Sequence, residues 1–244
     1  MLLGALAGCH FDHGQSGRDA AMIDAPPDAI RIDGPPSEGL PPVPIVFVQE
    51  AAFTNMGNHN TVSTAFLTPE IAGDFNVVVV SWSDGSSGVM MVSDDQGNMY
   101  TAATTLLATA SFSMRIYYAT NVRAGATTVT ARTMGNVPSP KLRVFEYSGV
   151  ALMSPVDVTA AQMGVGADST AGPITTMHAR DLLFAANVVA TVTTGAGPTF
   201  TERQLDGGDL VEERVVNAVG NFTATAPMTA DGDWIMQLVA FKGQ

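Results

Sequence analysis

Cysteine is almost absent from this 244-residue chain, which contains one, Cys9. A single cysteine cannot form an intramolecular disulfide, nor can it supply a cysteine-rich zinc site. Only 14% of the residues are charged, yet no run of eighteen apolar residues occurs, so a helix that spans a membrane is not expected. Because 46% of the residues are hydrophobic, we expect a folded part that is stabilised by its core.

Basic residues are also scarce: 11 lysines and arginines stand against 23 aspartates and glutamates, for a formal net charge of −12. Nucleic acid is therefore not an expected partner, because its phosphates require a basic surface. Electrostatic docking on anionic lipid is disfavoured for the same reason. The acidic balance is expected to keep the protein soluble and unaggregated.

Signatures of catalysis are missing as well. The histidines have no partner histidine or cysteine at the spacing of a zinc site, so no metal or cofactor is expected. These are His10, His13, His59 and His178. No Gly-x-Ser-x-Gly motif occurs. Glu212 and Glu213 lie on a predicted strand and point to opposite faces, so they cannot form an acid–base pair, and a solvated face is the expected environment. We expect a protein that is not an enzyme.

The N-terminus carries the most informative motif. Residues 1–8 are apolar and end in small residues, and Leu6-Ala7-Gly8-Cys9 resembles the lipobox of bacterial lipoproteins. The resemblance implies that a signal peptidase cuts before Cys9 and that its thiol carries diacylglycerol. It also implies an extracytoplasmic protein, anchored at the outer membrane or cell surface. Residues 1–9 contain no lysine or arginine, so either the start codon lies upstream or this is an ordinary apolar N-terminus with a chance cysteine.

Residues 10–44 are acidic and proline-rich. Asp24-Ala25-Pro26-Pro27-Asp28-Ala29 is followed by Ile32-Asp33-Gly34-Pro35-Pro36, a loose repeat with little apolar surface. Such a composition predicts a disordered, extended tether, with a reach on the order of 100 Å at ~3.1 Å per residue. The interpretation is a passive spacer between the anchor and the folded head.

Residues 45–244 are predicted to form a single all-β domain, an antiparallel two-sheet β-sandwich. Short apolar and β-branched runs recur about every ten residues between Gly, Asp, Asn and Ser turns, and helical periodicity is absent. Two runs, 76–82 and 182–189, are apolar on both parities and are therefore expected to be central strands. The other predicted strands are 45–48, 88–92, 99–101, 115–119, 127–131, 141–147, 200–204, 210–216, 221–225 and 234–241.

A weak internal echo suggests two similar halves. Residues 68–74 precede the first buried run and residues 175–181 precede the second, and both segments end in aspartate. Two long halves favour interleaved Greek keys, a jelly-roll-like arrangement. Asp74 with Val77 to Trp82, and Phe145-Glu146-Tyr147-Ser148-Gly149, are similar to a largely uncharacterised β-sandwich module of secreted bacterial proteins. That resemblance covers most of 45–242 and implies no catalytic or ligand residues.

Two features of the head are candidates for binding. Asp94 and Asp95 open a turn with hard oxygen ligands that could hold calcium, although Asp and Asn in such a turn more often bond the nearby backbone. Tyr117 and Tyr118 could stack on a sugar, although aromatic residues in such strands more often belong to the core. Because strand parity alternates, the two rings must face opposite ways, and at most one is expected to be buried in the sandwich.

The leading hypothesis is a lipid-anchored surface protein whose non-catalytic head recognises glycan or protein. The order of anchor, spacer and β-sandwich favours this interpretation. A purely structural or adhesive envelope component is the alternative, and binding to a glycan array would distinguish the two.

Overall fold

A computed structural model describes residues 41–54, 56–85, 88, 91–125 and 127–244. Residues 1–9, with the lipobox, and residues 10–40 of the predicted tether lie outside the described residues. The described residues form β-strands and no helix, and every strand pairing is antiparallel. The all-β, antiparallel prediction is confirmed.

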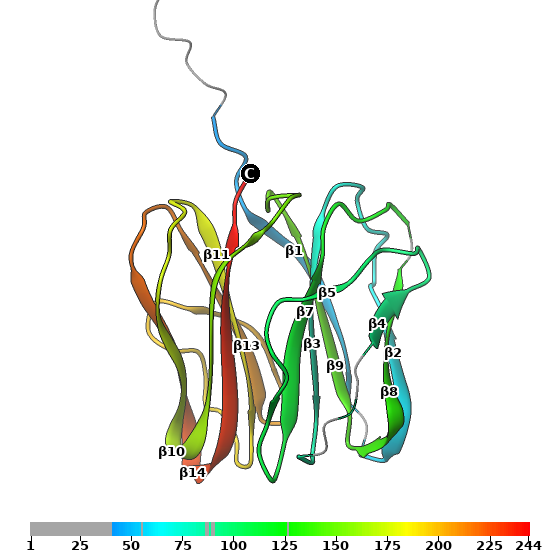
Figure 1. The fold of residues 1–244 in the computed structure, drawn as a ribbon, viewed down its shortest axis with the longest axis vertical. Helices are drawn as coiled ribbons and strands as arrows, with labels where there is room; N and C mark the ends of the chain where they lie inside the picture. Colours follow the sequence, from blue (N-terminus) through cyan, green and yellow to red (C-terminus); the bar gives the residue numbers. More distant parts are fainter. Residues whose placement is uncertain (1–40, 55, 86–87, 89–90, 126) are drawn as a thin grey trace, which may run out of the picture. The chain divides into compact units, whose positions relative to one another are not determined.

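Three sheets make up the head (Figure 1). The first large sheet has the order β1 (Val46–Thr54), β9 (Lys141–Ser148), β3 (Phe75–Trp82), β7 (Ser113–Ala119), β5 (Thr101–Ala102), with β6 (Leu107–Ala108) also paired to β7. The second has the order β10 (Val156–Thr175), β14 (Asn221–Lys242), β11 (Asp181–Val189), β13 (Asp209–Val216), β12 (Thr201–Asp206). A small third sheet has the order β2 (Asn58–Ala65), β8 (Thr128–Pro138), β4 (Met91–Asp94).

Strands β3 and β11 occupy the interior of the two large sheets. Each has a hydrogen-bonded neighbour on both sides, and every residue of each strand is buried. Their apolar residues on both parities are what such a position requires, because both faces of the strand are covered. Both were predicted as central strands, and this is confirmed.

The main core lies between the two large sheets. Phe75 and Phe145 on the first sheet meet Phe241 and Phe184 on the second, with ring centroids 5.0 and 5.3 Å apart in edge-to-face geometry. Aromatic pairs of this kind add to the stabilisation from area burial alone. The two large sheets therefore pack face to face in a sandwich-like arrangement.

The outer face of each large sheet is covered as well. Val80 and Trp82 of the first sheet pack with Val62 and Val129 of the three-stranded sheet. The outer face of the second sheet packs against apolar residues from the far parts of β10 and β14, among them Ala171, Ile174, Ala224 and Ala226. The head thus has a third sheet and a folded-over strand pair in addition to the two sheets predicted. These extra layers cover the outer faces of the two large sheets.

Candidate functional site

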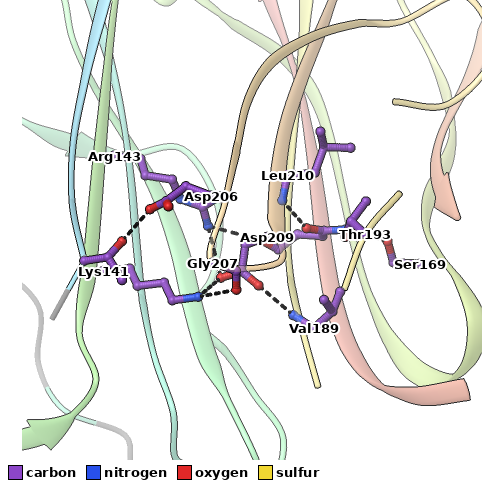
Figure 2. A network of polar contacts seen from close by, with 11 residues as sticks. Lys141, Arg143, Ser169, Val189, Thr193, Asp206, Gly207, Asp209 and Leu210 are labelled. Atoms are coloured by element: carbon purple, nitrogen blue, oxygen red, sulfur yellow. Dashed lines mark hydrogen bonds and ion pairs between the residues drawn. The ribbon is translucent and has the colours of Figure 1, made fainter. Parts of the chain in front are cut away.

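A polar network lies inside the main core, at the end where β9 begins (Figure 2). Lys141 and Arg143 come from β9 of the first large sheet, and Asp209 comes from the first position of β13 in the second. Arg143 has the same strand parity as Phe145 and Tyr147 of the main core, which places it on the face of β9 that meets the second sheet. The network joins the two sheets through charge.

Asp209 is the centre of the network. Its Oδ2 lies 2.6 Å from Lys141 Nζ and 3.8 Å from Arg143 Nη2, and its Oδ1 accepts a hydrogen bond from Val189 N at 3.0 Å. The side chain is fully buried, as is that of Arg143, whereas Lys141 is 15% exposed. Two cations therefore offset the burial of one carboxylate, and the pKa of Arg143 is lowered by burial, with Asp209 opposing the shift.

Asn187 on β11 extends the network into the second sheet. Its Oδ1 accepts from Leu210 N at 2.7 Å, and its Nδ2 donates to Ser169 Oγ and Thr193 Oγ1 at 2.9 and 3.0 Å. Arg143 Nη2 donates to the Asn187 carbonyl at 3.2 Å. These contacts fix neighbouring strands relative to one another, which is a structural role.

A group of carboxylates lies at the opposite end of β9. Glu146 is fully buried and accepts hydrogen bonds from Gln49 Nε2 at 2.6 Å and Ile71 N at 3.2 Å. Burial, and then the neighbouring Glu146 carboxylate, raise the pKa of Asp74 to about 6. Burial likewise raises the pKa of Glu70 to about 7, and this is opposed by Thr127 and Asn76. Glu70 and Asp74 can therefore take up protons near neutral pH.

The second large sheet has a related arrangement at the start of β11. Asp181 is buried, and burial followed by the nearby Asp157 carboxylate raises its pKa to about 6. His178 Nδ1 lies 3.3 Å from Asp181 Oδ1 and opposes that shift. Asp74 and Asp181 thus have the same environment: each lies at the beginning of a central strand with another carboxylate beside it.

The prediction of a solvated face for Glu212 and Glu213 is wrong. Both are buried, because both faces of β13 are covered by other parts of the fold. Glu212 Oε2 accepts from Gly197 N at 2.7 Å, and burial raises its pKa to about 7. Glu213 pairs with Arg203 of β12, whose guanidinium stacks 4.3 Å from the centroid of the Phe47 ring. The two glutamates have separate partners and do not form an acid–base pair.

Asp94 and Asp95, the predicted calcium residues, act as hydrogen-bond acceptors in their turn. Asp94 Oδ1 accepts from the backbone N–H groups of Gln96 and Asn98 at 3.1 and 2.9 Å. Asp94 Oδ2 accepts from the Asn98 amide at 2.8 Å and from the Tyr100 hydroxyl at 3.0 Å. Asp95 accepts from Thr128 N at 3.0 Å, which lowers its pKa. These contacts match the turn interpretation.

Tyr117 and Tyr118 face opposite sides of β7, as strand parity requires. Tyr117 is only 5% exposed and packs with the core beneath the three-stranded sheet. Tyr118 is half-buried in the main core, where it stacks on Phe75 and meets Phe241. Both rings are covered because both faces of the sheet are covered. The sequence did not decide which ring is exposed, and in the structure Tyr118 is the more exposed of the two.

Across the described ranges from residue 41 onward, no group of three or more His, Cys, Asp or Glu side chains is placed to hold a metal ion. In the same part of the chain, no helix is long and apolar enough to cross a membrane. Sequence reasoning missed Glu70, Arg143 and Asp209, because nothing in the local pattern distinguishes a buried charge from an exposed one.

No protein-family model, curated protein or solved structure matches the chain.

Proposed function

We propose that this protein is a lipid-anchored, extracytoplasmic protein of the bacterial cell envelope whose β-rich head binds a protein partner and does not catalyse a reaction. The lipobox-like Leu6-Ala7-Gly8-Cys9 supports lipid attachment at Cys9, and the acidic, proline-rich composition of 10–44 supports a tether. Two or three acyl chains would hold such a protein on a bilayer durably.

The types of apolar side chain that are exposed favour a protein partner over a glycan. Among the residues described by the structure, every large hydrophobic side chain that is exposed is Met, Leu, Ile or Val, and none is aromatic. Met91 on β4, for example, is 62% exposed. Sugar binding commonly uses an exposed aromatic ring, whereas methionine adapts its shape to protein surfaces.

The burial of the perturbed carboxyl groups supports a non-catalytic head. Glu70, Asp181 and Glu212 have raised pKa values, which is a property of many general acids. All three side chains are at most 2% exposed, so a substrate has no access to them. Burial inside the fold accounts for their pKa values without a catalytic role.

We also propose that the head is a jelly-roll-like domain built of two halves of common design. The strand orders β1-β9-β3-β7-β5 and β10-β14-β11-β13-β12 support this, since the first strand of each half lies beside its last strand, followed by an inner strand. The matching environments of Asp74 and Asp181 also support it.

Phase separation in a nonionic detergent tests the anchor. The gene with its upstream sequence is expressed in a bacterium, and cell extracts are separated into detergent and aqueous phases. The wild-type protein should enter the detergent phase and a Cys9→Ser variant the aqueous phase. Equal behaviour of the two proteins would contradict lipid attachment at Cys9.

A photo-crosslinking amino acid in place of Met91 tests the protein partner. The expected result is one discrete adduct in intact cells, which mass spectrometry identifies as protein. Binding of the purified head to a glycan array, without an adduct, would instead favour glycan recognition.

A further inference from the structure

Five loop segments lie at one end of the head, beside the 120–125 loop, and they are called the loop end below: 41–46, 66–74, 149–155, 176–180 and 217–220. Strand register brings them together, since Val46 pairs with Ser148 and Asp181 pairs with Lys242. The described chain enters the head here: Ile45 packs in the main core, and residues 41–45 lie at the same end as the C-terminus (Figure 1).

Backbone contacts hold these segments to one another. Gly243 N donates to Arg180 O at 2.7 Å, and Ala151 N donates to Lys242 O at 2.8 Å. Thr176 N donates to Gly220 O at 3.0 Å. Gly149 has a φ of +77°, and a Cβ on it would lie 2.0 Å from the Pro44 carbonyl oxygen, so the incoming chain packs closely on this segment. These contacts hold four of the five segments, whereas segment 66–74 is bonded to Val122 and Gly125 of the neighbouring loop.

The exposed side chains of the loop end are mainly apolar. Leu67 is 93% exposed, Met153 85%, Met177 75% and Ile71 63%. Val43, Val46, Leu152 and Val219 are also exposed there. Soluble proteins rarely gather apolar side chains on one surface without a partner to cover them.

The charges of the loop end differ from those of the whole chain. The protein has a net charge of −12, yet the five segments contain no exposed carboxylate. Their only two acidic residues, Glu70 and Asp74, are buried, and burial raises both pKa values. The nearby basic groups are His178 and Arg180, both half-buried, and the exposed Arg123, whose loop is bonded to segment 66–74. A nearly neutral, apolar surface on an acidic protein is suited to contact with hydrocarbon and not to contact with water.

We propose that the loop end docks on the surface of a lipid bilayer by shallow insertion of its apolar side chains, Leu67, Ile71, Met153 and Met177 foremost. The proposal rests on the proposed lipid anchor for its biological setting, because the chain that leads to Cys9 joins the head at this end. Cys9 precedes Pro41 by 32 residues. The tether would raise the effective concentration of this surface at the bilayer, in addition to the affinity that the surface has by itself. Apolar insertion also explains how an acidic protein can contact lipid without electrostatic attraction.

Flotation with phosphatidylcholine vesicles tests this proposal on the full chain carrying Cys9→Ser. The Cys9→Ser chain should float with the vesicles equally at low and high salt. Adding Leu67→Asp and Met153→Asp should lower the partition coefficient by roughly tenfold or more, because a charge in the apolar boundary is costly. Met134→Asp on β8, at a methionine that is 84% exposed, is the matched control and should float like its parent.

Three results would overturn the proposal. The first is a Cys9→Ser chain that does not float, and the second is flotation that Leu67→Asp and Met153→Asp leave unchanged. The third is a dimer in sedimentation velocity that the same two substitutions dissociate, which would make a second copy the occupant. Thermal melting of each variant confirms that it is folded. Since Cys9→Ser removes any lipid attachment, none of these results depends on whether Cys9 is modified in the cell.

Discussion

Lys141 Nζ lies 2.6 Å from Asp209 Oδ2, and this contact joins strand β9 of one large sheet to strand β13 of the other. Lys141 and Asp209 are 68 positions apart in the chain. Together with Arg143, they place three charges at one end of an otherwise apolar core. Buried pairs of this kind have a large desolvation cost, so the loss of one partner is felt strongly.

Asp209→Asn is expected to lower the free energy of unfolding by about 3 kcal/mol, because it removes the buried carboxylate that is the stronger of the two acidic neighbours of Arg143. Urea unfolding at pH 7 measures the change. Glu202→Gln on the exposed part of β12 is the control and should change stability by less than about 0.5 kcal/mol. If Asp209→Asn costs no more than the control, the network does not stabilise the contact between the sheets.

Phe241→Ala should lower the free energy of unfolding by a similar amount, for a different reason. The Phe241 ring lies 5.0 Å from the Phe75 ring and 5.8 Å from the Tyr118 ring, between the two large sheets. Removing it leaves a cavity in the main core, and the expected loss is about 3–5 kcal/mol in urea unfolding. Leu205→Ala, at a residue that is 39% exposed, should cost far less. Equal losses for the two would show that the sheets do not share a close-packed core.

Stability should be greater in mild acid than at neutral pH. The pKa values of Glu70 and Glu212 are raised to about 7, and those of Asp74 and Asp181 to about 6. In each case the folded state binds the proton more tightly than the unfolded state does. The stabilisation is therefore fully present below the unfolded pKa and is lost as pH rises through the folded pKa. The midpoint temperature of thermal unfolding should therefore decrease as the pH is raised from about 5 to about 8. A midpoint temperature that increases over this pH range would contradict the raised pKa values of these four carboxyl groups.

Glu212→Gln should remove part of that pH dependence. Gln retains an oxygen that can accept from Gly197 N and carries no charge that burial would penalise. The variant is expected to be more stable than wild type at pH 8, by on the order of 1–3 kcal/mol, and nearly equal to it at pH 5. Unfolding in urea at the two pH values measures both differences. Destabilisation at pH 8 would mean that the charged form of Glu212 is the stabilising one.

The fold class could be read from the sequence, but several strands could not. Runs such as Val77 to Val80 are apolar on both parities, and this pattern has few interpretations other than a central strand. In contrast, β10 (Val156–Thr175) is rich in Gly and Ala and contains Pro173, all of which are depleted in strands, and it was not predicted. Strand β2 (Asn58–Ala65) is mostly polar and was missed for the same reason. Pairing with β14 and β8 determines their conformation, and sequence pattern alone does not reveal partners so far along the chain.

The candidate sites were less predictable than the fold. Strand parity correctly placed Tyr117 and Tyr118 on opposite faces, but it could not show that a further layer covers each face. The burial of Glu212 and Glu213 was missed for the same reason. The segments 68–74 and 175–181 resemble each other in sequence and both end in aspartate. Asp74 and Asp181 prove to have similar environments, so this sequence similarity was informative.

The most direct test of the central claim is the mass of the mature N-terminus. The protein is recovered from bacterial membranes after expression from the gene with its upstream sequence, and its N-terminal peptide is analysed by mass spectrometry. The expected peptide begins at Cys9, lacks residues 1–8 and carries the mass of a diacylglyceryl group on sulfur. A peptide that retains residues 1–8 with an unmodified Cys9 would contradict the lipid anchor.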